Sequence, residues 1–154
     1  MEPRFLVDAM LGKLARWLVI LGYDANFAGG SGRPDVELME EAQREGRIFV
    51  TRDARIPDVA GVRKVVLRQA DFEEQLVELA RELSLKPDPA LRFTRCAHCN
   101  APLETLTREE ALPLVPPKVQ TLDTPFWRCR ICARLYWNGT HTDSVFETIK
   151  RLGI

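Results

Sequence analysis

The 154-residue chain carries its four cysteines as two closely spaced pairs, Cys96/Cys99 and Cys129/Cys132. Two residues separate the thiols of each pair, a spacing that lets both sulfurs reach one metal ion, and two such pairs complete a tetrahedral site. Residues 1–95 contain no cysteine, and the N-terminus lacks the basic and then apolar character of a secretory signal. We therefore expect a structural Zn²⁺ site with four thiolate ligands, in a cytoplasmic protein without disulfides.

Three aspartates occur at or near the carboxyl ends of predicted strands, where an open parallel sheet collects its ligands. Asp8 ends the first strand, Asp53 follows a later one, and Asp35 opens a helix after a glycine-rich loop. Crowded carboxylates repel each other unless a divalent cation joins them, and oxygen ligands suit Mg²⁺ or Mn²⁺. Such ions activate water and stabilise the charge on a phosphate under attack. The structural alternative is that Asp8 and Asp35 are helix N-caps and Asp53 holds a turn.

Arginines and aromatic residues are interleaved around the cysteines. Between residues 91 and 141 there are seven Lys or Arg and four Asp or Glu. Arginines beside exposed aromatic rings hold phosphates and stack on nucleobases. Alternatively, the rings form a small core and the arginines face solvent. His98 and His141 could serve as substitute metal ligands, but four cysteines already complete the site. The residues concerned are Arg92, Arg95, Phe126, Trp127, Arg128, Arg130, Arg134, Tyr136 and Trp137.

The elements that must position these residues alternate between strands and helices in the first half of the chain. Such alternation predicts an α/β fold with a doubly wound parallel sheet and helices on both faces. Asp71, with Glu74 three residues later, is a capping signal for the last of these helices. Apolar runs predict strands over 4–8, 25–27, 48–51 and 64–67, and helical periodicity predicts helices over 11–22, 34–46 and 72–83.

Two prolines within residues 86–89 cannot continue a helix, so the first domain is expected to close near Leu85. We predict a domain of residues 1–85, a linker of 86–90, and a metal-held module of 91–154 with a C-terminal helix. Inside the module, Thr107 and Glu110 predict one short helical turn. The module is too small to fold on an apolar core of its own.

Composition excludes several classes of protein. Apolar residues make up 45 % of the chain, as in a globular domain, and no apolar run approaches the ~20 residues of a membrane span. The 22 Lys and Arg are balanced by 22 Asp and Glu, so any nucleic-acid surface must be local.

Several of these segments resemble the Mut-seven C-terminal RNase family, which joins a PIN-like nuclease domain to a zinc ribbon. The resemblance covers almost the whole chain. It rests on residues 5–18 and 21–24, on Asp35-x-x-Leu38, Gly46-Arg47 and Thr51-Arg52-Asp53, on the two cysteine pairs, and on Phe126-Trp127-x-Cys129 and Tyr136-Trp137-x-Gly139-x-His141.

The resemblance implies a PIN-like fold, a C-terminal Cys₄ zinc ribbon and metal-dependent cleavage of RNA. One departure is Arg55, at a position where wider PIN-like relatives often carry a further Asp, with Asp58 as an alternative donor. The residues that the resemblance carries over are Asp8, Asp35 and Asp53 as ligands of Mg²⁺ or Mn²⁺, and Lys13, Arg16 and Arg52 as phosphate contacts.

These observations together predict a Mg²⁺- or Mn²⁺-dependent ribonuclease that contacts RNA and no membrane. One alternative is a non-catalytic RNA- or ribosome-binding module, which Arg55 in place of an aspartate favours. The other is an adaptor whose zinc ribbon docks a protein partner. The three aspartates favour the enzyme.

Overall fold

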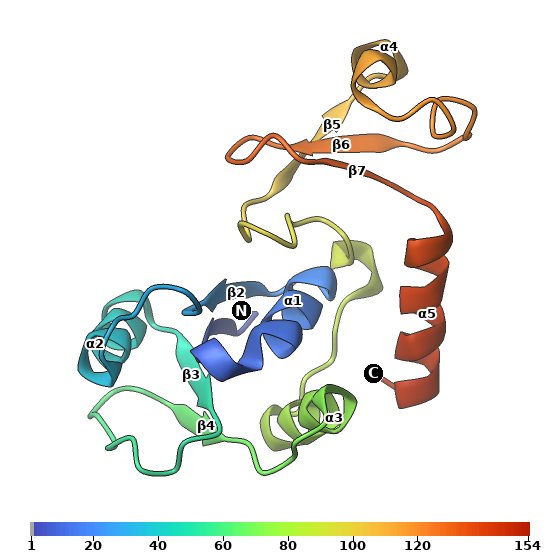
Figure 1. Cartoon of the computed structure of the whole chain (residues 1–154). Helices are drawn as coiled ribbons and strands as arrows, with labels where there is room; N and C mark the ends of the chain where they lie inside the picture. Colours follow the sequence, from blue (N-terminus) through green and yellow to red (C-terminus); the bar gives the residue numbers. More distant parts are fainter. Residues whose placement is uncertain (1) are drawn as a thin grey trace.

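A computed structural model of the chain describes residues 2–154, and its first half is built on a parallel sheet (Figure 1). The strands follow the order β2-β1-β3-β4, and each lies within one residue of its predicted bounds. The sheet order reverses between β1 and β3, because β2 lies on one side of β1 while β3 and β4 follow on the other. These strands are β1 (Arg4–Val7), β2 (Asp24–Phe27), β3 (Ile48–Thr51) and β4 (Lys64–Val66).

Helices cover both faces of this sheet, as predicted from the alternation of elements. Side chains of β1 alternate between the faces: Phe5 and Val7 pack with α1 and α3, whereas Leu6 packs with α2. Asp71 caps α3 by accepting hydrogen bonds from two backbone N–H groups of its first turn. The helices are α1 (Gly12–Ile20), preceded by a 3₁₀ turn at Ala9–Leu11, α2 (Asp35–Glu45) and α3 (Phe72–Leu83).

The second half contains a small antiparallel sheet, which with its connections forms the ribbon, residues 91–139. Strand β6 (Phe126–Cys129) lies between β5 (Leu103–Leu106) and β7 (Leu135–Trp137). Helix α4 (Arg108–Ala111) is the predicted helical turn, with a capping box between Thr107 and Glu110, and a 3₁₀ turn (Leu112–Leu114) follows it. The buried apolar core of the ribbon is small, comprising Leu106, Ala111, Val115, Val119 and Phe126.

The last helix, α5 (Thr140–Leu152), returns from the ribbon to the first half of the chain (Figure 1). Its Val145 and Ile149 belong to the same buried core as β1, α1 and α3. The guanidinium of Arg151 makes two hydrogen bonds to the carboxylate of Glu73 on α3, at 2.7 and 2.8 Å. Helix α5 therefore packs with residues of the predicted 1–85 segment, although in sequence it follows the ribbon.

The segment that enters the ribbon packs closely against the end of α1. Gly22 has φ +101°, and a Cβ there would lie 2.5 Å from the carbonyl oxygen of Leu91, in the 3₁₀ turn Pro89–Leu91. The backbone N–H of Phe93 donates to the carbonyl of Ile20 at 3.0 Å. The glycine predicted to stop the helix thus also leaves room for Leu91 to pass close to it.

Candidate functional site

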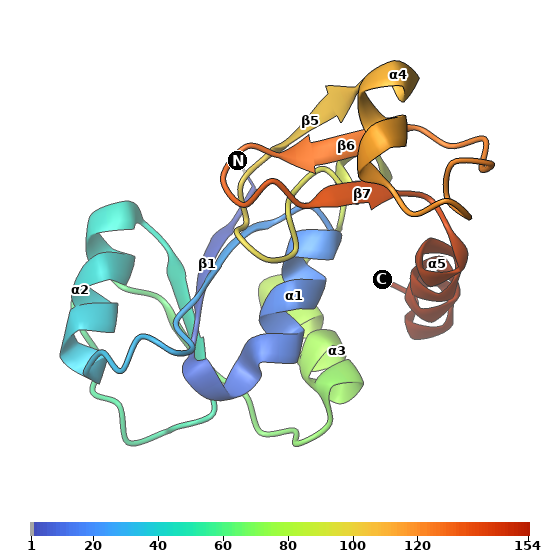
Figure 2. The ribbon, with the colours of Figure 1, turned by 45° about the horizontal axis from the view of Figure 1, so that its top comes forward.

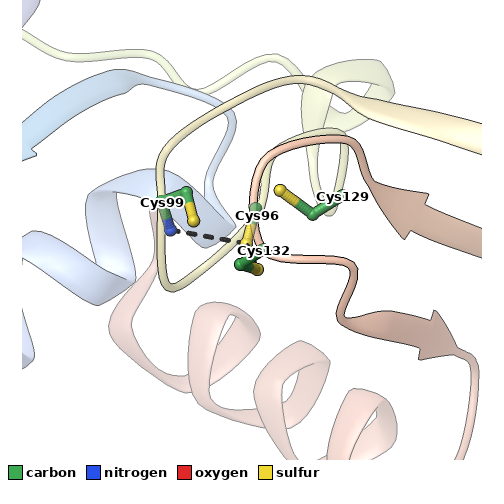
Figure 3. A group of neighbouring side chains, drawn as sticks. All are labelled: Cys96, Cys99, Cys129 and Cys132. Carbon is green, nitrogen blue, oxygen red and sulfur yellow. Dashed lines mark hydrogen bonds between the residues drawn. The ribbon is translucent and has the colours of Figure 1, made fainter.

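The four cysteines meet at one end of the ribbon sheet, where their sulfurs all lie within 4.8 Å of one another (Figure 3). The Sγ atoms of Cys96 and Cys132 are 3.7 Å apart. A tetrahedron with Zn–S distances of about 2.3 Å has edges of about 3.8 Å, so this spacing fits a single Zn²⁺ ion. The structure brings together all four predicted ligands, and among residues 2–154 neither His98 nor His141 joins the group.

The two cysteine pairs lie in similar backbone turns. The N–H of Cys99 points at Sγ of Cys96, and the N–H of Ile131 points at Sγ of Cys129, both at 3.4 Å. The residues after each pair, Asn100 and Ala133, take left-handed backbone conformations with φ 64° and 60°. N–H groups aimed at sulfur favour thiolates, which are the metal-binding form of cysteine.

The electrostatics of the cluster also suit a cation. Burial raises the pKa of Cys96, but hydrogen bonds from the Tyr136 hydroxyl, 3.1 Å away, and from backbone N–H groups outweigh it and lower that pKa to about 7. Burial and the neighbouring sulfurs raise the pKa of Cys99 to about 12. Four thiolates at this spacing repel one another, so a divalent ion is needed to hold them all.

Asp8 and Asp53 follow β1 and β3, the two neighbouring strands at which the sheet order reverses. Ligands of open parallel sheets bind beside the carboxyl ends of such strands. Thr51, which is fully buried, donates its hydroxyl to Oδ2 of Asp8 at 2.6 Å and accepts the N–H of Asp53 at 3.0 Å. One hydroxyl therefore joins the two predicted aspartates in a single hydrogen-bonded group.

The structural interpretations of these aspartates hold in part. Asp8 accepts the N–H of Ala9 at 2.7 Å and caps the 3₁₀ turn that follows β1. Asp53 accepts the N–H of Arg55 at 2.9 Å within a turn. Asp35 is the first residue of α2, where Pro34 occupies the N-cap position, so its exposed carboxylate does not cap the helix. Asp8 and Asp53 thus have structural roles that leave further carboxylate lone pairs free.

Arg55 lies beside the acidic edge, the set of Asp8, Asp35 and Asp53. Its guanidinium makes two hydrogen bonds to the Asp53 carboxylate, at 3.0 and 3.2 Å. These bonds and the backbone N–H of Arg55 lower the pKa of Asp53, while Asp53, and more weakly Asp35, raise the pKa of Arg55. As a set of three, the aspartates do not approach within 4.8 Å in the part of the chain that the structure describes. Asp58, the alternative donor, pairs with Lys64 at 2.8 Å.

The three predicted phosphate contacts lie in different surroundings. The ammonium of Lys13 lies over the ring of Phe72, 3.9 Å from its centroid. Arg52 is exposed beside Asp53. Arg16 lines a cleft of about 660 Å³ between the first half of the chain and the ribbon. Among residues 2–154, no ion pair involves Arg16 or Arg52, so both side chains are free to meet a phosphate.

The arginines of the ribbon divide into two groups. Arg128 and Arg130 both bind the carboxylate of Glu104, at 2.8 and 2.6 Å, which neutralises part of their charge. Arg134 instead lines the same cleft as Arg16. The sequence does not distinguish these arginines. In the structure Arg134 faces the cleft toward the first half of the chain, whereas Arg128 and Arg130 pair within the ribbon.

Asn100, directly after the first cysteine pair, fastens the ribbon to the edge strand β2. Its amide accepts the N–H of Ala25 at 3.1 Å and donates to the carboxylate of Asp24 at 2.7 Å and to Asn26 at 3.0 Å. Burial raises the pKa of Asp24, but hydrogen bonds from Arg47, Asn100 and Arg4 hold it well below its usual range. The metal-binding turn therefore covers part of the edge strand and fixes one wall of the cleft.

Sequence reasoning overlooked Thr51 and Asn100 as parts of the site. Thr51 stands two residues before Asp53, and Asn100 stands directly after a cysteine pair in a position that needs left-handed backbone. Their positions next to predicted site residues are the only sequence signals for a role in the site. The fold is needed to show that Thr51 reaches Asp8 and that Asn100 reaches β2.

The protein belongs to a class that joins two parts. One is a parallel α/β sheet with carboxylates where the strand order reverses, and the other is a ribbon with four clustered cysteines. The family model of the Mut7-C RNAse domain matches residues 3–149, and the chain belongs to that family. The family indicates a ribonuclease-like protein with RNA as its substrate. A search of the curated proteins gives no match, and a search of the solved structures gives none either. Within residues 2–154, none of the helices combines the length and apolar character that crossing a membrane requires.

Proposed function

We propose that this protein is a ribonuclease with a PIN-like nuclease domain that hydrolyses phosphodiester bonds of RNA with the help of Mg²⁺ or Mn²⁺. Asp8, Asp35 and Asp53 are the proposed ligands. The observation that carries the proposal is the hydrogen-bonded group in which Thr51 joins Asp8 to Asp53 at the reversal of the sheet order. Family membership supplies the substrate class.

Each residue of this group has a defined task in the proposed reaction. Thr51 and the N–H of Ala9 fix the orientation of the Asp8 carboxylate, since each oxygen of that group accepts one hydrogen bond. The remaining lone pairs of Asp8 and Asp53 would hold the metal. A bound Mg²⁺ or Mn²⁺ lowers the pKa of water and stabilises the charge that develops on the phosphate. Zn²⁺ bound by the four cysteines is structural, because four thiolates leave no coordination position for substrate.

Arg16 and Arg52 are the stronger candidates for phosphate contact. Arg16 lines the cleft and Arg52 is exposed beside the acidic edge. Lys13 contributes only if its ammonium leaves the ring of Phe72, which costs a cation–π interaction of about 0.5–1 kcal/mol.

One observation favours a second function, a non-catalytic RNA-binding module. Arg55 pairs with Asp53 through two side-chain hydrogen bonds and so competes with a metal ion for that carboxylate. Under this alternative the acidic edge is vestigial and the cleft still binds RNA.

Asp8→Asn tests the enzyme against the module, because it keeps the shape of the side chain and removes its charge. We expect metal-dependent cleavage to fall by more than about 100-fold, beyond the usual effect of losing a single outer hydrogen-bond partner. The measurement is cleavage of a mixed set of single-stranded and structured RNAs with Mn²⁺. Asp71→Asn is the matched control, because it makes the same change at a helix cap on α3.

Three outcomes decide the question. Cleavage lost in Asp8→Asn but kept in Asp71→Asn supports the nuclease. Equal cleavage by all three proteins identifies a contaminant and removes the support for an enzyme. RNA binding without cleavage in every protein replaces the nuclease with the binding module.

A further inference from the structure

One face of the ribbon sheet carries half-buried aromatic side chains that lie outside the ribbon's apolar core. Across β6 and β7, Phe126 pairs with Trp137 and Trp127 pairs with Tyr136. Successive residues of a strand point to opposite faces, and Phe126 is buried in the ribbon core. Trp127 and Tyr136 therefore lie on the other face, and both line a cavity together with residues of α1 and of the start of α5. Figure 2 shows the ribbon beside these two helices.

This face closes a cavity of about 150 Å³, the aromatic cavity, between the ribbon, α1 and α5. A cavity of this size admits a group as large as a benzene ring. Among the described residues that line it there is no carboxylate, so its charge is positive or neutral. The aromatic members of the lining are Phe93, Trp127, Tyr136 and Trp137, and the polar members include Arg16, Arg95, Asn138 and His141.

The aromatic cavity adjoins the larger cleft, since Arg16 and Ala97 line both. Arg134 and Gly12 also line the cleft. Gly12 begins α1, four residues after Asp8. A strand with one group in the cavity can therefore lay its backbone along the cleft toward the acidic edge.

We propose that the aromatic cavity binds one unpaired nucleobase of a single-stranded RNA whose phosphates follow the cleft to the acidic edge. Flat rings supply the stacking surface, Asn138 and His141 supply hydrogen-bonding groups, and Arg16 stands where the base-binding and phosphate-binding regions meet. This inference rests on the proposed function and adds to it a substrate class, RNA with an unpaired base at a fixed distance from the cut.

Trp127→Leu tests the cavity, because it keeps an apolar side chain and removes the stacking ring, while Trp127→Phe keeps a ring and is the matched control. Binding is measured by fluorescence anisotropy without Mg²⁺, Mn²⁺ or chelator, so that no cleavage occurs and zinc is retained. The probes are a labelled single-stranded RNA and an abasic strand of equal length with the same sugar–phosphate backbone. Zinc content and thermal unfolding establish that each variant is folded.

We expect the native protein to bind the RNA more tightly than the abasic strand. Trp127→Leu should weaken RNA binding by roughly five- to a hundredfold, the range for one lost base–aromatic stack, and leave the abasic strand unaffected. Trp127→Phe should keep most of the affinity. In a Trp17→Phe background, whose remaining tryptophans are Trp127 and Trp137, RNA should quench the fluorescence and the abasic strand should not.

Equal affinity of the native protein for both strands would overturn the base site and leave RNA binding intact. Equal weakening of both strands by Trp127→Leu would also overturn it, because the residue would then be only structural. If the native protein binds neither strand, the proposed function fails together with the inference.

Discussion

Thr51 performs two tasks at the acidic edge with one hydroxyl group. It donates to Asp8 and accepts from the backbone of Asp53, and it is fully buried. Arg55 acts on the same group from the solvent side, where it pairs with the Asp53 carboxylate. Thr51, the last residue of β3, and Arg55, which competes for Asp53, thus lie four positions apart on the chain.

Arg55→Gln should strengthen metal binding at the acidic edge. It removes the charge that pairs with Asp53, so a divalent cation no longer displaces a guanidinium. Because the pair is exposed, the expected gain in Mn²⁺ affinity is modest, up to about fivefold. Titration calorimetry with Mn²⁺ measures it on protein with its zinc retained.

Arg52→Gln is the control for this measurement, since Arg52 is also exposed beside Asp53 but makes no ion pair within the described residues. An equal gain in both variants would mean that Mn²⁺ senses only the general charge of the surface. No gain in either would remove Arg55 as a competitor for the site.

At the scale of elements, the first cysteine pair does more than offer two thiolates to a metal ion. Its backbone turn places Asn100 against β2, where the side chain satisfies the N–H of Ala25 and contacts Asp24 and Asn26. An edge strand is a surface with unpaired backbone groups, so this contact both covers the edge and sets the position of the ribbon.

Asn100→Gly should lower the free energy of unfolding by about 1–3 kcal/mol, the usual cost of leaving a part-buried backbone donor without its partner. Glycine tolerates the left-handed conformation, so the change isolates the lost hydrogen bonds from backbone strain. Denaturant unfolding monitored by circular dichroism gives the value.

Ala133→Gly is the matched variant at the second cysteine pair. Ala133 has nearly the same φ but no hydrogen-bonding side chain, so glycine there should be neutral or stabilising. If both variants destabilise the protein equally, the side chain of Asn100 does not hold the ribbon to β2.

At the scale of the whole molecule, α5 connects two parts of very different size. The core around the parallel sheet includes β1, α1, α3 and two residues of α5, whereas the ribbon core has five buried apolar residues. Small cores of this kind need metal to remain folded. The domain boundaries 1–85, 86–90 and 91–154 stay a prediction. Helix α5 belongs to the last of these segments in sequence, but it packs in the core of the first.

Zinc removal should therefore unfold the ribbon and spare the parallel sheet. With a chelator, hydrogen exchange followed by mass spectrometry should show β5, β6 and β7 losing protection while β1 and β3 keep theirs. Cys129→Ser should give the same pattern without chelator. The control is chelator saturated with zinc, and simultaneous loss of protection in both halves would show that the chain unfolds as one unit instead.

The sequence alone was sufficient for the strands and helices of the first half of the chain, for the grouping of the four cysteines and for the family. Apolar periodicity, helix caps and cysteine spacing involve residues close together in sequence, so they can be recognised without knowledge of the tertiary structure. They also marked Asp8 and Asp53 as strand-end carboxylates, since parallel strands place such residues on one edge of a sheet.

Tertiary structure alone decided which partner each charged side chain meets. Arg128 and Arg130 bind Glu104 on the neighbouring strand of the ribbon, and Arg134 and Arg16 line one cleft. In sequence these arginines are alike, because pairing depends on side chains brought together from distant segments. The return of α5 to the first core has the same cause: its apolar stripe predicts a buried face but does not say which core buries it.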